Sequence, residues 1–245
     1  MDSLDPPIKH LLVDLDGTLL GNRNFLLSVS FVRQSLHALK KYGGYRKAVA
    51  ALWSINAVFK KPNREFTNDH RVVELFSKKM DLKPEEGRSL IKDQLSLIFP
   101  ELKRHFFPVP GSKDFLDWAK NHYPMTLATN PVWPPEIIEL RVRWAGIDPT
   151  IFQSITHVRR MHACKPAKEY YEEILELEKL KPEDCLLIGD DVKMDLPATQ
   201  VGIRVFIVGH YKRLTHLKHP KAKALAWRGS YKALRTLLEN SPKAT

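Results

Sequence analysis

Short apolar runs recur along the chain, and each gives way to a turn or to polar residues. The runs cover residues 11–13, 125–129, 185–189 and 205–208, with a weaker one at 154–158. Continuous apolar runs of this length are typical of strands buried on both faces. Apolar residues at helical spacing lie between them, at 112–121 and 170–177. Strands that alternate with helices predict an α/β fold, with a parallel sheet covered by helices on both faces.

The stretch from residue 21 to about residue 108 departs from this alternation. Apolar residues repeat every three or four positions over 25–39, which predicts an amphipathic helix that ends at Gly43 and Gly44. Further helices are predicted over 46–59, 69–80 and 84–98. Because no strand pattern occurs in this stretch, we expect an all-helical insertion after the first strand. We refer to residues 21–108 as the helical insertion.

The composition is that of a globular chain. Of the 245 residues, 43% are hydrophobic, which is enough for a buried core. The first residues lack the pattern of a secretory signal, and no run of about 20 apolar residues predicts a membrane span. Only two cysteines occur, Cys164 and Cys185, so we expect a reducing, cytoplasmic setting.

The charge is unevenly distributed. The net charge is +11, and residues 21–64 hold nine Lys or Arg and no Asp or Glu, which leaves +2 for the rest of the chain. This regional positive field favours an anionic partner, although a well-solvated surface gives the same pattern. No basic and aromatic motif of a known nucleic-acid-binding module occurs, so we expect no nucleic-acid partner.

The first candidate for chemistry is the segment Asp14-Leu15-Asp16-Gly17-Thr18, at the end of the first apolar run. In an extended strand, side chains two residues apart share a face. One carboxylate could then attack phosphorus, while the other transfers protons to and from oxygen. Gly17 permits a sharp turn and exposes backbone amides to phosphate oxygens. A polar turn that merely ends the strand is the alternative interpretation.

A second acidic group, comprising Asp190, Asp191 and Asp195, follows the apolar run at 185–189. Three carboxylates this close together suit Mg²⁺, although acidic residues are also typical of a helix start, above all for Asp195. Two weaker signals are Thr129-Asn130, which follows another apolar run, and Lys165-Pro166. Because the carboxyl ends of parallel strands share one edge of the sheet, Asp14, Thr129 and Asp190 are expected to converge there.

Together these segments resemble the four signature motifs of the haloacid dehalogenase superfamily, over residues 9 to about 208. The DxDGT motif is matched by Asp14 to Thr18, and the strand ending in Thr or Ser by residues 125–129. The Lys-Pro motif is matched at Lys165, and GDDxxxD by residues 189–195. The resemblance implies a Rossmannoid core formed by residues 1–20 and 109–245. It also implies that residues 21–108 form a mobile cap of the helical C1 type.

The resemblance also implies a role for each motif residue. Asp14 would be the nucleophile and a Mg²⁺ ligand, and Asp16 the general acid and base with its backbone carbonyl on the metal. Asp190 would bind the metal, and Asp191 and Asp195 would bind it directly or support its ligands. The phosphoryl group would be held by Gly17, Thr129, Asn130 and Lys165, and Lys165 would also act in catalysis by stabilising its charge. Because Asp16 supplies a proton donor that true dehalogenases lack, phosphate esters are the favoured substrates.

The resemblance predicts a Mg²⁺-dependent phosphatase that hydrolyses a phosphate monoester through an aspartyl-phosphate on Asp14. Phosphoryl transfer, as in related phosphomutases, and a non-catalytic protein that binds a phosphorylated ligand remain alternatives. In capped relatives the cap selects the substrate, so Arg46 and Lys47 are candidates for binding a second anionic group of the substrate. Residues 45–61 could instead contact a membrane, although packing inside the cap is favoured. The oligomeric state stays open.

Overall fold

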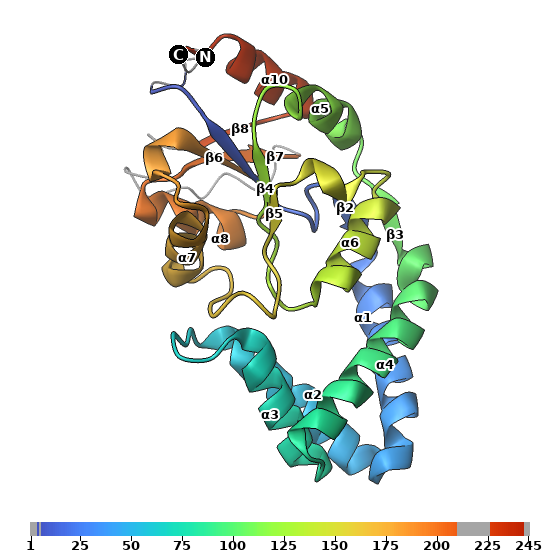
Figure 1. The fold of residues 1–245 in the computed structure, drawn as a ribbon. Helices are drawn as coiled ribbons and strands as arrows, with labels where there is room; N and C mark the ends of the chain where they lie inside the picture. The colour runs from blue at the N-terminus through green and yellow to red at the C-terminus, as the bar shows by residue number, and fades with distance from the viewer. Residues whose placement is uncertain (1–3, 5, 210–225, 243–245) are drawn as a thin grey trace.

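The structure is a computed structural model that describes residue 4, residues 6–209 and residues 226–242 (Figure 1). Its centre is a six-stranded sheet in which every pair of neighbouring strands is parallel. In sheet order the strands are β5 (Ser154–Ile155), β4 (Met125–Leu127), β1 (His10–Val13), β6 (Cys185–Gly189), β7 (Arg204–Val208) and β8 (Ala226–Gly229). The α/β fold class predicted from the apolar runs is confirmed.

Helices cover both faces of the sheet. Successive strand residues point to opposite faces, so each face carries apolar side chains that a layer of helices buries. Val13 belongs to one apolar cluster and its neighbour Leu12 to another. The first cluster includes residues of α5 (Ser112–Ala119), α6 (Pro135–Trp144) and α10 (Tyr231–Glu239). The second includes α7 (Lys168–Glu178) and borders α8 (Val192–Asp195). Short 3-10 helices complete the connections at η1 (Lys40–Tyr42), η2 (Lys103–His105), η3 (Pro149–Ile151), η4 (Pro182–Asp184) and η5 (Leu196–Val201).

The helical insertion contains the four helices that the sequence predicts. They are α1 (Asn24–Leu39), α2 (Gly44–Lys60), α3 (Asn68–Met80) and α4 (Pro84–Leu102). They gather on one side of the sheet, and α1 packs against α4 as α2 packs against α3 (Figure 1). Leu39, Phe76, Met80 and Leu90 are buried in a small apolar core of their own.

A two-stranded antiparallel sheet joins the insertion to the rest of the chain. It pairs β2 (Leu20–Asn22) with β3 (Phe106–Pro108). The expectation that residues 21–108 contain no strand is therefore wrong at both ends. These strands of three residues are too short to show an alternating pattern in the sequence. The division into core and cap at residues 20/21 and 108/109 stays a prediction, and β2 lies across the first boundary while β3 ends at the second.

The insertion leaves several large apolar side chains exposed. In α2, Ala48, Ala51 and Val58 are buried, whereas Trp53 is 78% exposed. Packing inside the insertion therefore accounts for part of the apolar stretch at 45–61 and not for Trp53. Among the helices of the described part of the chain, none has the length and apolar character required to cross a bilayer.

Candidate active site

Asp14, Thr129 and Asp190 follow the carboxyl ends of the neighbouring strands β1, β4 and β6. Asp14 follows β1, and its backbone N–H donates to the carbonyl of Ile188 in β6 at 2.9 Å. On the other side of β1, Ala128 after β4 donates to the Val13 carbonyl at 2.7 Å. These bonds hold the three strand ends in register. Residues that are distant in sequence therefore meet at one edge of the sheet, as the parallel topology predicts.

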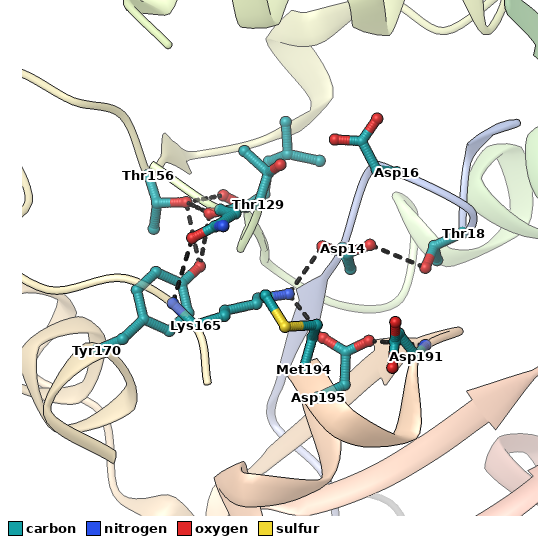
Figure 2. Close-up of polar contacts among 12 residues, drawn as sticks. Asp14, Asp16, Thr18, Thr129, Thr156, Lys165, Tyr170, Asp191, Met194 and Asp195 are labelled. Carbon is teal, nitrogen blue, oxygen red and sulfur yellow. Dashed lines mark hydrogen bonds and ion pairs between the residues drawn. The ribbon is translucent and has the colours of Figure 1, made fainter. Parts of the chain in front are cut away.

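Lys165 lies between two buried carboxylates (Figure 2). Its Nζ donates to Asp14 Oδ1 and to Asp195 Oδ1, both at 2.7 Å, and all three side chains are buried. The other oxygen of Asp14 accepts a hydrogen bond from the Thr18 hydroxyl at 3.1 Å. Both Asp14 oxygens are therefore fixed in direction by neighbouring side chains.

Burial and the charge of Lys165 act in opposite directions on the pKa of Asp14. Burial raises the pKa of Asp14 to about 7, against the opposing effect of Lys165, and the Asp195 charge adds to the rise. Burial alone would lower the pKa of Lys165, but the two carboxylates raise it well above its ordinary value. Lys165 therefore stays charged, while the two carboxylates share a single positive partner.

Three carboxylates form a cluster that could hold a metal ion. One oxygen each of Asp14, Asp190 and Asp195 can be chosen so that all lie within 4.8 Å of one another. Two glycines allow this approach, because a Cβ on Gly17 would collide with the Asp190 carboxylate and one on Gly189 with that of Asp195. Carboxylate oxygens are the ligands that Mg²⁺ prefers, so the chemistry of this donor set fits the ion.

Asp191 has a different position from the other two acidic residues of its motif. Its carboxylate accepts a hydrogen bond from the Lys193 backbone N–H at 2.8 Å and caps the start of α8. Its own backbone N–H donates to Asp195 Oδ2 at 3.1 Å. The helix-start interpretation that the sequence offered for Asp195 thus applies to Asp191. Asp191 supports the cluster through its backbone.

Asp16 is paired with a residue that the sequence analysis did not identify. Its carboxylate forms an ion pair with Arg141 of α6, whose side chain is buried. Figure 2 shows the Asp16 carboxylate directed away from Asp14. The sequence did contain a signal for Arg141, since it lies three or four residues after Ile138 and Ile137 on the buried face of α6. A charged residue on an apolar helix face usually has a partner.

The loop after β4 is fixed by residues from two other segments. The Thr129 carbonyl accepts hydrogen bonds from the Thr156 hydroxyl at 2.6 Å and from the Tyr170 hydroxyl at 2.8 Å. Asn130 Oδ1 accepts one from the Lys165 backbone N–H at 3.2 Å. The segment that carries Lys165 is thereby tied to the end of β4. Thr156 and Tyr170 were missed because nothing in their local sequence marks these long-range contacts.

A cavity of about 720 Å³ adjoins the site. Residues from all four helices of the insertion line it, together with Asn130 and Lys165 from the sheet side. Arg46 and Lys47 are not among the lining residues. Both are exposed, and Lys47 pairs with Asp81 at 2.5 Å on the surface of the insertion. Their proposed contact with substrate stays a prediction.

Comparisons with known proteins identify a family and a fold. A family model described as haloacid dehalogenase-like hydrolase matches residues 8–201. A search of curated protein sequences gives no match. Many solved structures are similar, among them a HAD phosphatase from Thermococcus onnurineus, with 18% identity and a TM-score of 0.59 over 96% of this chain and 99% of that one. A 2-haloacid dehalogenase from Pseudomonas syringae pv. Tomato, at 18% identity, has a TM-score of 0.65 over 95% of this chain and 98% of its own. At these identities the likeness concerns the fold.

Proposed function

The chain belongs to the haloacid dehalogenase-like hydrolase family, and from this we propose that it is a magnesium-dependent phosphatase acting on a phosphate monoester. The observation that carries the proposal is the buried Asp14 carboxylate, held by Lys165 and Thr18 beside an acidic cluster. The presence of Asp16 favours phosphate esters over haloacids, because an alcohol leaving group needs a proton and a halide does not.

In the proposed mechanism Asp14 attacks phosphorus with a carboxylate oxygen. The bond between phosphorus and the ester oxygen breaks as the aspartyl-phosphate forms, and Asp16 gives its proton to the departing alkoxide. For this step the protonated Asp16 side chain would leave Arg141 and turn towards the ester oxygen, because in the structure its carboxylate is paired with Arg141 and directed away from Asp14. Asp16 then takes a proton from water as the water oxygen attacks the phosphorus and releases Asp14. One phosphate and one alcohol are formed for each water consumed.

Other residues of the site supply binding and charge. Asp14, Asp190 and Asp195 would hold Mg²⁺ through their carboxylates, and Asp16 through its backbone carbonyl. The bound ion would offset the negative charges of phosphate and carboxylates. The Lys165 ammonium would stabilise the phosphoryl oxygens, with Thr129, Asn130 and the Gly17 backbone as further contacts.

We expect inorganic phosphate to be released from a panel of phosphomonoesters in Mg²⁺ and not in EDTA. The reason is that Asp14 and Asp195 share the single charge of Lys165 and lie in a cluster of three carboxylates, so a bound divalent cation would reduce the repulsion that a dianionic ester meets there. Phosphate release is measured without added bisphosphate, which separates a hydrolase from a phosphomutase. Equal release in Mg²⁺ and EDTA would contradict the proposal.

We also expect Asp16→Asn to discriminate between leaving groups. Loss of the proton donor should lower kcat about 10²–10⁴-fold for an alkyl phosphate, whose alkoxide needs protonation. The loss should be much smaller for p-nitrophenyl phosphate, because nitrophenolate leaves without a proton. Asp114→Asn, at an exposed position of α5, is the matched control and should change neither rate. An equal loss with both substrates would argue against proton transfer by Asp16.

A further inference from the structure

The cavity beside Lys165 extends well beyond the proposed catalytic residues. It extends from Asn130 and Lys165 between α1, α2, α3 and α4. Its volume of about 720 Å³ exceeds the needs of a phosphoryl group, and it lies within the roughly 300–1,000 Å³ typical of small-molecule pockets. The space beyond Lys165 is therefore large enough for the esterified group of a substrate.

The walls of this cavity are mainly apolar. Phe31, Ile55, Phe59, Val73 and Leu95 contribute from the four helices of the insertion. Trp133 contributes from the loop after β4, and its ring packs edge-on against Phe31 with centroids 5.4 Å apart. An apolar surface of this kind gains free energy when it covers hydrocarbon and excludes water.

The charged groups of the lining are largely neutralised by one another. Arg88 is paired with Asp69, and Arg159 forms a bidentate pair with Glu136 at 2.9 and 2.7 Å. Gln94 is a polar exception, since its buried Oε1 has no hydrogen-bond partner within the described residues and can accept one from a ligand. Besides the buried Lys165, two lysines line the cavity, Lys60 and Lys92, and both are exposed to solvent. Among the described residues that line the cavity, a second phosphate or carboxylate of a substrate would thus find no buried cation besides Lys165.

We propose that the substrate is a phosphate monoester whose esterified group is a long or bulky hydrocarbon, held in this cavity with its phosphate at Lys165. The inference rests on the proposed phosphatase function and specifies its substrate class. It differs from the expectation, based on the charge of residues 21–64, of a substrate with a second anionic group. The basic side chains of that segment lie mostly on the outside of the insertion, whereas several of its apolar side chains, among them Phe31, Ile55 and Phe59, line the cavity.

A series of n-alkyl phosphates from ethyl to octyl, used below their micelle concentrations, tests this substrate class. We expect kcat/KM to rise roughly two- to fourfold with each added methylene until the cavity is filled. Glycerol phosphate should be a poorer substrate than butyl phosphate. Values of kcat/KM that do not change with chain length, or that favour the polar ester, would overturn the inference.

Two substitutions on α4 test whether the dependence of kcat/KM on chain length arises in this cavity. Leu95 lines the cavity, whereas Leu97 does not line it and is 69% exposed. Leu95→Lys should reduce the ratio of kcat/KM for octyl phosphate to that for ethyl phosphate by about tenfold or more, because it places a charge against hydrocarbon. Leu97→Lys carries the same charge on the same helix and should leave this ratio unchanged. If the ratio of kcat/KM for octyl phosphate to that for ethyl phosphate is the same in the two variants, the hydrocarbon does not bind in this cavity.

Binding of the non-hydrolysable octylphosphonate and ethylphosphonate, measured by calorimetry, separates this inference from the proposed function. If no ester is hydrolysed but octylphosphonate binds more tightly and Leu95→Lys removes the difference, the cavity assignment holds and the phosphatase proposal fails. If esters are hydrolysed through Asp14 but neither turnover nor phosphonate binding depends on chain length, the phosphatase proposal holds and the cavity assignment fails.

Discussion

Replacing Asp14 with asparagine is expected to reduce phosphate release on the order of 10⁴-fold or more, because the variant lacks the anionic nucleophile. Asparagine keeps the size of the side chain, and its amide oxygen can still accept from Lys165 or Thr18. The measurement is steady-state phosphate release with the best ester of the panel in saturating Mg²⁺. Turnover equal to that of the wild-type protein would exclude Asp14 as the nucleophile.

The stability of the same variant provides a control that does not depend on turnover. The pKa of Asp14 is raised from 3.8 to about 7 by burial, so the folded protein binds a proton at Asp14 more tightly than the unfolded chain does. Its contribution to stability is fully present below pH 3.8 and is lost as the pH rises through about 7. Without metal, Asp14→Asn should therefore be less sensitive to pH between about 4 and 7 than the wild-type protein. Chemical unfolding in EDTA at several pH values would measure this difference.

The central sheet could be predicted from the sequence because its strands are buried on both faces. Continuous apolar runs such as 185–189, followed by polar turn residues, favour a strand because they are shorter than a typical helix. The edge strand β8 (Ala226–Gly229) and the pair β2 and β3 lacked that signal, since they are short and include glycine, proline or charged residues. Helix α6 was also not assigned, although Pro135 and Glu136 form a regular helix start.

The candidate site was predictable where its residues follow strands. Asp14 and Asp190 lie beyond adjacent parallel strands, so topology alone brings them together. Arg141 and Tyr170 come from helices, and their contacts with Asp16 and Thr129 depend on how those helices pack. Such contacts between distant segments leave no local pattern. The same holds for the cavity, because the spacing of apolar residues in α1 to α4 does not show whether their faces meet or leave space between them.

Replacing Lys165 with methionine is expected to be the most destabilising change in the site. Lys165 is the shared cation of two buried carboxylates, and removal of one partner of a buried ion pair costs about 3–5 kcal/mol of unfolding free energy. The loss should be largest above pH 7, because at lower pH Asp14 can take up a proton and relieve the repulsion from Asp195. The measurement is chemical unfolding in metal-free buffer at pH 6 and pH 8.

Lys168→Met is the matched control for this prediction. Lys168 lies three residues further along the chain and forms a surface pair with Glu172 at 3.2 Å, so its loss should change stability by about 0.5 kcal/mol or less.

Added Mg²⁺ should restore part of the stability of Lys165→Met, because a cation bound at Asp14 and Asp195 replaces the missing positive charge. Phosphate release should nevertheless stay about 10²–10³-fold lower, since a charge that stabilises the transferring phosphoryl group is still absent. If Lys165→Met is as stable as Lys168→Met at pH 8 without metal, Lys165 does not compensate the two carboxylates, and their charge must be neutralised by protons instead.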